Sequence, residues 1–144
     1  MEVHVDRSLE ALVADSGLSL SPLGTAFLSR YSDDMSRSWD ARYDWLADGF
    51  GVTIKGDKFQ QDFHTLVEIR NAIVHGSGEL TKRQQAGLAK FVQLRKRMES
   101  VVNVRVYGTR IVFATDSVAR SLNVASDFVR GFDQSLLAKR KIDY

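Results

Sequence analysis

The sequence contains no cysteine, so it can form neither a disulfide framework nor a zinc site built on thiolates. Histidine is scarce as well. The three histidines, His4, His64 and His75, share no spacing typical of metal ligands. We therefore expect no bound metal, and nothing in the sequence suggests another cofactor.

Long apolar runs and a strong net charge are also missing. No segment approaches the roughly 18 consecutive apolar residues of a membrane span, and residues 1–6 lack the basic and apolar regions of a signal peptide. We expect a cytoplasmic protein that makes no contact with a membrane. The net charge is only +2, from 20 basic and 18 acidic residues, so nucleic acid could be bound only through a local basic patch.

The length and composition are those of one globular domain. A chain of 144 residues, 44% of them hydrophobic and 26% charged, is typical of a folded domain rather than of a disordered or fibrous chain. A chain of this length buries about 68–70% of the surface of its unfolded state. We predict a single domain that spans residues 1–144.

Helical periodicity dominates the first third of the sequence. A short helix is predicted from Ser8 to about Asp15, and Gly17 ends it. Ser21 followed by Pro22 is typical of an N-cap with proline at the first helical position. The helix that they open should be about seven turns long, because apolar residues recur every three or four positions. These residues are Leu23, Phe27, Tyr31, Met35, Trp39, Tyr43 and Leu46.

Two capping-box patterns predict the next two helices. Asp57 with Gln60 should open a helix that runs to His75, where 76–78 (Gly-Ser-Gly) stops it. Thr81 with Gln84 should open a third helix. Its inward residues should be Leu88, Phe91, Val92 and Leu94.

The spacing of apolar residues then changes from the helical period to every second residue, and after the hairpin it becomes helical again. Valines alternate with polar residues from Val102 to Val106, and Gly108 separates them from 110–113, which predicts a small hairpin. A last helix is predicted from about Asp116 to Lys139. Its apolar stripe should be Val118, Leu122, Ala125, Val129, Phe132 and Leu136. The fold class is therefore mainly all-α, with a small β-hairpin before the last helix.

The segment 68–76 (EIRNAIVHG) carries the most distinctive chemistry in the chain. Arg70 is a permanent cation whose planar fork suits phosphate oxygens. His75 is the side chain best suited to move protons near neutral pH, and Asn71 lies between them in the sequence. A helix that gathers these groups at its C-terminal end, beside a glycine stop, is a candidate site for phosphoryl transfer.

The run from Arg70 to His75 resembles the R-x4-6-H motif of the HEPN superfamily, in which a polar residue follows the arginine. The layout is similar too, since a long helix precedes the motif helix and a further helix, a hairpin and a final helix follow it. The resemblance implies a HEPN-like helical bundle that cleaves RNA without a metal and leaves 2′,3′-cyclic phosphate and 5′-hydroxyl ends. By the same resemblance, His75 assists attack or protonates the leaving oxygen, Arg70 stabilises phosphoryl charge, and Asn71 orients His75 or contacts the substrate.

The resemblance also implies a homodimer and a biological setting. On a continuous helix, positions five apart differ by about 140° in azimuth, so Arg70 and His75 should not share a face. Two copies packed across a two-fold axis could complete each other's site, as HEPN dimers do, with either the long helix or the last helix as the dimer face. Such proteins are prominent among toxins of toxin–antitoxin systems and effectors of phage defence, so an antitoxin or defence-system partner is possible.

Plainer interpretations compete with these assignments. His75 and Gly76 could simply end a helix, with Gly76 in the left-handed position after the last turn. Arg95, Lys96 and Arg97 are candidates for contact with RNA backbone, although charged residues at a helix end are more often a solvated face. A histidine placed like His64, beside an aromatic residue on a helix, is more often structural than catalytic, so we expect a structural role for His64. The alternative function is a non-catalytic HEPN-like module that dimerises or binds a nucleotide or a partner protein.

Overall fold

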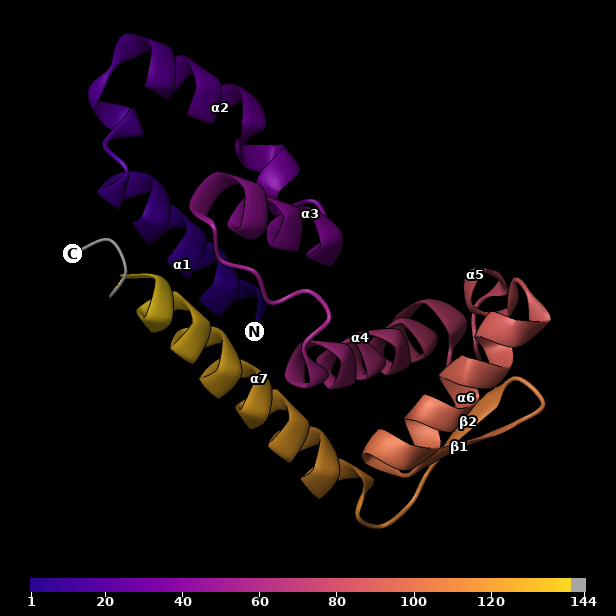
Figure 1. Cartoon of the computed structure of the whole chain (residues 1–144). Helices are drawn as coiled ribbons and strands as arrows, with labels where there is room; N and C mark the ends of the chain where they lie inside the picture. Colours follow the sequence, from indigo (N-terminus) through magenta and orange to yellow (C-terminus); the bar gives the residue numbers. More distant parts are fainter. Residues whose placement is uncertain (141–144) are drawn as a thin grey trace. The chain divides into compact units, whose positions relative to one another are not determined.

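The computed structural model describes residues 1–140, and in this part of the chain the fold is mainly α-helical, as predicted. The strands form one antiparallel hairpin before the last helix (Figure 1). The chain divides into two compact units, described separately below: unit 1 (Met1–Lys55 with Phe132–Tyr144) and unit 2 (Gly56–Gly131). The single HEPN-like domain over residues 1–144 stays a prediction. None of the described helices is both long and apolar enough to cross a bilayer.

Unit 1 opens with α1 (Glu2–Asp15), which begins well before the predicted start at Ser8. Val5 and Leu9 lie one helical turn apart and are 0% and 4% exposed, so a continuous buried stripe extends the helix toward the N-terminus. The 3-10 helix η1 (Leu18–Leu20) follows. Ser21 then caps α2 (Pro22–Ser36) by accepting the Gly24 N–H at 2.9 Å, as the serine–proline pattern predicts.

The predicted seven-turn helix is wrong, because the chain breaks after α2. Ser38 is extended (φ −153°, ψ 165°), and its hydroxyl accepts the Ala41 N–H at 3.1 Å. A serine that caps a new helix cannot also continue the old one. The helix therefore restarts as α3 (Trp39–Asp44) and continues into the π-helix η2 (Trp45–Gly49).

The restart at Ser38 places α3 in the core of unit 1. Trp39 and Tyr43 are buried, whereas Phe27 of α2 is 41% exposed. Arg42, 5% exposed, donates Nε and Nη2 to the two carboxylate oxygens of Asp6 at 2.7 and 3.1 Å. This bidentate pair ties α3 to α1.

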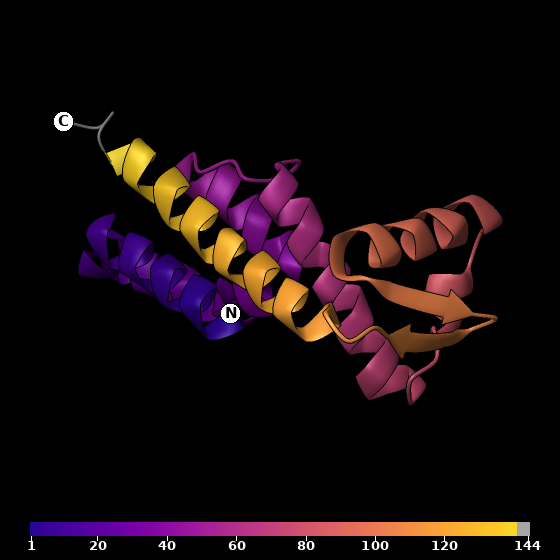
Figure 2. The ribbon, with the colours of Figure 1, turned by 90° about the horizontal axis from the view of Figure 1, so that it is seen from below.

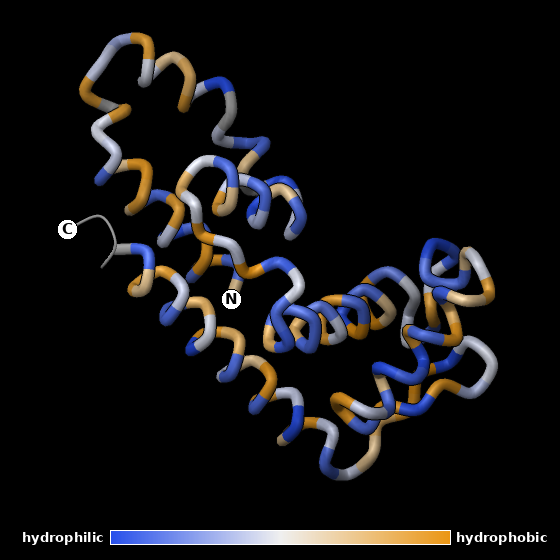
Figure 3. Tube along the Cα trace, viewed as in Figure 1, coloured by the Kyte–Doolittle hydropathy of each residue, from blue (hydrophilic) through white to orange (hydrophobic). Residues whose placement is uncertain are grey.

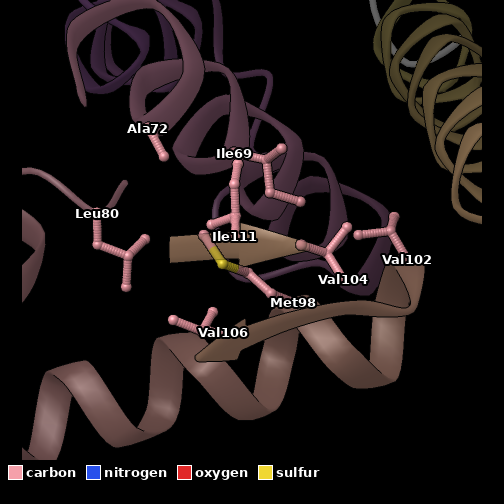
Figure 4. Packing of buried hydrophobic residues seen from close by; sticks show 8 residues of the cluster. All are labelled: Ile69, Ala72, Leu80, Met98, Val102, Val104, Val106 and Ile111. Carbon is pink, nitrogen blue, oxygen red and sulfur yellow. The ribbon is translucent and has the colours of Figure 1, made fainter. Parts of the chain in front are cut away.

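Unit 2 contains α4 (Lys58–Gly76), α5 (Lys82–Gln85), α6 (Leu88–Val102) and the hairpin strands β1 (Val104–Tyr107) and β2 (Arg110–Phe113). The first part of α7 (Ser117–Arg140) also belongs to it. Its main core joins the last turns of α4 and α6 to the inward side of the hairpin (Figure 4). The buried residues of this cluster are Ile69, Ala72, Leu80, Met98, Val102, Val104, Val106 and Ile111.

Of the two predicted capping boxes, only the second is correct. Asp57 occupies the N-cap of α4 but makes no side-chain cap bond, and the Gln60 side chain instead accepts the Gly56 N–H at 3.1 Å. Thr81 and Gln84 form the reciprocal box. The helix that they open ends at Gln85, and Gly87, at φ 88°, separates it from α6. The predicted third helix is therefore two helices.

The hairpin is confirmed, with β1 beside α6 (Figure 2). Val104 pairs with Phe113 and Tyr107 pairs with Arg110 in antiparallel register. Gly108 at φ 61° supplies the left-handed conformation that a two-residue turn requires. Val102 remains in α6, so the strand begins later than the alternation of valines suggests.

The predicted apolar stripe of α7 is partly wrong. Apolar positions recur along the whole helix (Figure 3), but Val118 and Leu122 are 67% and 64% exposed. Within unit 2 the buried apolar position of α7 is Phe128, whose ring stacks on Phe63 of α4 with centroids 4.1 Å apart. Phe132, in the unit 1 part of the helix, is buried as predicted. On α6, similarly, Leu88 and Val92 are exposed while Phe91 and Leu94 pack on the core cluster.

Gly131 marks a close approach of α7 to α4. A Cβ built at this position would lie 2.6 Å from the ring of Phe59. Gly131→Ala should therefore destabilise the fold by about 1–3 kcal/mol, although alanine normally favours a helix over glycine. Chemical denaturation measures the change. Gly76→Ala is the matched control, because a Cβ there meets Thr81 at an ordinary 3.5 Å. Equal stability of the two variants would contradict the close approach.

Three polar side chains join the end of α6 to the start of α7. Asn103, in the left-handed conformation at φ 55°, donates Nδ2 to Asp116 at 2.6 Å. The buried Ser117 hydroxyl donates to the Asn103 carbonyl at 2.8 Å and accepts the Ala114 N–H at 2.9 Å. The bonds from Asn103 and Arg120 hold the pKa of the Asp116 carboxyl below its usual value.

This lowered pKa fixes the sign of a pH dependence. The Asp116 carboxylate should stabilise the fold fully above about pH 4, its value in an unfolded chain, and lose that contribution as the pH falls through the folded pKa. Asp116→Asn should therefore lower the melting temperature at pH 7 and change it much less at about pH 2.5. Asp127→Asn is the control, because Asp127 forms a loose ion pair at 3.6 Å with Arg130, and both side chains are exposed. If Asp116→Asn changed the melting temperature equally at both pH values, the Asp116 carboxylate would not be the source of the pH dependence.

Candidate functional site

The last two turns of α4 bring the three predicted site residues together. Arg70 Nη1 lies 3.3 Å from His75 Nε2 and 3.4 Å from the Asn71 side-chain oxygen. Arg70 and His75 are exposed, and Asn71 is half-buried. Arg70 and His75 were expected not to share a face of the helix, but their side chains nevertheless meet. Their Cα positions do differ in azimuth, but the long arginine side chain crosses the gap along the helix surface.

The contact between Arg70 and His75 involves the Nε2 atom of the imidazole. A guanidinium has only donors, so in this hydrogen bond Nε2 must be the acceptor. His75 therefore presents the lone pair of Nε2 to a cation that a phosphate group would also attract.

The helix end itself is held by backbone bonds. Ser77 takes the left-handed conformation (φ 53°, ψ 36°), and the N–H groups of Ser77 and Gly78 both point to the Ala72 carbonyl, Gly78 at 3.0 Å. Gly76 is the last helical residue, so the interpretation that places it in the left-handed position is wrong by one residue. Because Ala72 is 0% exposed, the turn that carries His75 is anchored directly on the core.

The loop after His75 also pairs with the hairpin. The Gly78 carbonyl accepts the Ile111 N–H at 2.9 Å, and the Leu80 N–H donates to the Thr109 carbonyl at 2.7 Å. The Thr109 hydroxyl donates to the Glu79 carboxylate at 3.0 Å. The short segment 78–80 thus lies along β2 like a third strand. This pairing could not be predicted, since residues 76–78 indicated only the end of a helix.

A second set of bonds supports α4 on the side of α5. Glu68 accepts from Arg83 at 3.0 and 3.2 Å, and from the Gln84 side chain at 2.6 Å. Gln84 Nε2 also contacts the Glu68 carbonyl at 2.8 Å. These hydrogen bonds hold the middle of α4 against α5. The capping-box pattern identified Gln84, but only its local role could be predicted from it.

The predicted RNA-binding residues of α6 point in different directions. Arg95 Nη2 donates to the Val106 carbonyl of β1 at 2.8 Å, and its guanidinium lies 5.6 Å from the Phe91 ring. Arg97 is engaged with α4, including Asp62 at 3.3 Å. Lys96 is exposed. Contact of these residues with RNA stays a prediction, but two of the three already have structural partners.

The small net charge hides a strong asymmetry. Unit 2, which carries the site, has twelve lysines and arginines against seven aspartates and glutamates, whereas the rest of the chain has eight against eleven. Unit 2 is thus net positive and the rest net negative. His64, on the half-buried part of α4, lies outside the cluster around Arg70. Within residues 1–140 no three His, Asp or Glu side chains gather into a potential metal site.

The left-handed conformation of Ser77 at the end of α4 can be tested by substitution. Ser77→Gly should raise the free energy of unfolding by about 0.5–1 kcal/mol, because glycine adopts a positive φ without a steric penalty. Ser77→Ala should give no such gain. Urea denaturation of the three proteins distinguishes these outcomes, and a loss of stability in Ser77→Gly would show that the helix ends differently.

Comparison with known proteins adds no assignment to this geometry. No family model matches the chain, and no curated protein or solved structure is significantly similar to it. Inference about function therefore depends on the cluster at the end of α4 and on the charge of the unit that contains it.

Proposed function

We propose that this chain is a metal-independent endoribonuclease whose site consists of Arg70, Asn71 and His75 and is completed in a homodimer. The observation that carries the proposal is the contact of Arg70 with both His75 and Asn71 at an exposed helix end. A cation that binds phosphate and a neutral imidazole that accepts a proton are the two groups that cleavage of RNA by its own 2′-hydroxyl needs. The positive charge of unit 2 supports attraction of a polyanion.

The proposed reaction uses the substrate's own 2′-hydroxyl. A backbone phosphate binds Arg70, which leaves the lone pair of His75 Nε2 available. Nε2 takes the proton of the 2′-hydroxyl as its oxygen attacks phosphorus, and the bond from phosphorus to the 5′-oxygen breaks. The leaving oxygen takes a proton from the imidazolium at the site. The products are a 2′,3′-cyclic phosphate and a 5′-hydroxyl, and Arg70 stabilises the charge on the phosphoryl oxygens.

Exposed apolar residues next to the site support the homodimer. Ile73 and Val74, within the motif, are 48% and 54% exposed. Their burial between two copies of α4 would exclude water from the reacting groups and add a second set of site residues. The exposed Leu23 of α2 and Leu122 of α7 are alternative apolar faces. By resemblance to HEPN toxins and defence effectors, we further propose that the nuclease acts on cellular or phage RNA under the control of a partner protein.

The decisive experiment is a cleavage assay on total RNA and on transfer RNA in the presence of EDTA, with the product ends mapped. Arg70→Ala and His75→Ala should each lower the cleavage rate by about 10²–10⁴-fold. His4→Ala and Arg130→Ala are matched controls, because they remove the same residue types from helices other than α4. Circular dichroism should show all four variants folded.

Three other results of these experiments would contradict part of the proposal. Cleavage by both site variants at the parent rate would show that the site is elsewhere. A folded, dimeric parent that cleaves no RNA would favour the non-catalytic binding module. Cleavage by a protein that sedimentation shows to be monomeric would leave the nuclease intact and reject the shared site.

A further inference from the structure

The outward side of the hairpin carries an unusual set of residues. Val104, Val106 and Ile111 point inward to the core, so the alternate residues of the two strands face solvent. Four of these residues, Arg105, Tyr107, Arg110 and Val112, form what is called here the outer hairpin face. Tyr107 is 61% exposed and Val112 is 43% exposed. Most of this aromatic ring is in solvent, and within unit 2 the Tyr107 hydroxyl interacts with the Arg105 guanidinium, so the face of the ring remains open to a ligand.

Two arginines flank this exposed tyrosine. Arg110 is directly opposite Tyr107 in the strand register, and Arg105 lies two residues before it on the same side of β1. Side chains directly opposite each other in a hairpin have Cβ atoms about 5 Å apart. The Tyr107 ring is therefore placed between two guanidinium groups. A base can stack on such a ring while its neighbouring phosphates meet the cations.

The carboxylates near the outer hairpin face do not hold its two arginines tightly, so both guanidinium groups can bind a phosphate. Glu99 is 3.4 Å from Arg105, but both side chains are 60% exposed, so the pair is weak and can exchange for a phosphate. Glu79 is opposite Arg110 in an isolated bridge, and its carboxylate accepts the Thr109 hydroxyl at the turn. The side chain of Arg110 makes no ion pair with any residue of the described part of the chain.

The outer hairpin face is also connected to the site. Arg110 pairs with Glu79, which is only four residues after His75. From the length of an extended chain and the width of a strand pair, the Cα atoms of Arg110 and His75 are at most about 20 Å apart. That span equals a few nucleotides of an extended strand. Because β2 is hydrogen-bonded to the loop after His75, this spacing is fixed by the fold.

We propose that the outer hairpin face binds single-stranded RNA, with a base stacked on Tyr107 and phosphates held by Arg105 and Arg110. This inference rests on the proposed function, and it names the substrate class: an RNA with an unpaired segment that the outer hairpin face holds. Single strands are favoured over duplexes, since a base must leave its own stack to reach the tyrosine ring. Recognition through a ring and two cations is tolerant of sequence.

Binding and cleavage must be measured separately to test this. Fluorescence anisotropy with a labelled single-stranded RNA of about 12 nucleotides measures binding in the His75→Ala background, where cleavage cannot remove the probe. Adding Tyr107→Ala should weaken binding about 5- to 100-fold, whereas Tyr107→Phe should bind like the background protein because the ring is kept. Arg105→Gln with Arg110→Gln should lower the slope of log affinity against log salt by about 1.4, as expected for two lost phosphate contacts.

The controls separate the hairpin from the catalytic site. Arg130→Gln removes an exposed arginine of unit 2 and should leave binding unchanged, and a duplex of the same length should bind more weakly than the single strand. Unchanged binding in Tyr107→Ala, or equal affinity for the duplex, would overturn the inference whether or not the parent cleaves RNA. Loss of self-association in place of RNA binding would show instead that this face joins two copies. A parent that binds through Tyr107 but never cleaves would overturn the nuclease and keep the binding surface.

Discussion

The burial of Ala72 is the constraint on which the candidate site depends. This residue is fully buried among the hairpin and α6, and its carbonyl accepts the two N–H groups that end α4. Arg70 is two positions earlier, about 160° away around the helix, so packing Ala72 inward turns Arg70 outward. The same anchored turn holds His75 at the helix end. An exposed pair of reactive groups can therefore have a defined geometry, because the residue between them is fixed by the core.

The distribution of charge gives that exposed pair a context. A net charge of +2 suggests no affinity for nucleic acid, but the positive charge is concentrated in unit 2. Part of it is already used within that unit, where Arg97 meets Asp62 and Arg83 meets Glu68. The cations that remain exposed include Arg70, Arg110 and Lys96, which come from three different elements. This division between structural and available cations cannot be made by counting residues.

Local signals in the sequence predicted the elements whose causes are local. The box at Thr81 and Gln84, the stop after His75 and the alternation in the hairpin each depend on residues that are close in the chain, and all three are confirmed. The break at Ser38 was missed because the apolar spacing continues across it, and only the serine cap reveals the new start.

Features that depend on distant partners could not be predicted in the same way. α7 carries apolar residues on more than one side, and stacking on Phe63 selects Phe128 as the buried one while Val118 stays exposed. The role of Arg95 likewise needs a strand carbonyl that lies eleven residues away in sequence. The candidate site was proposed from its residue types, but the contact between its side chains was not foreseen. The azimuth of a residue gives the direction in which its side chain leaves the helix. The position of the guanidinium also depends on the conformation of the long arginine side chain.

The contact between Arg70 and His75 has a consequence for when the proposed site can act. While Arg70 donates to Nε2, the lone pair that must take the 2′-hydroxyl proton is occupied. A phosphate is a stronger partner for a guanidinium than a neutral imidazole is, because the bond is assisted by charge and can be bidentate. The substrate's phosphate would thus bind the cation and release the base in one event. In the proposed enzyme a bound phosphodiester would therefore compete with His75 for Arg70, and its binding would favour the state in which Nε2 can take the 2′-hydroxyl proton.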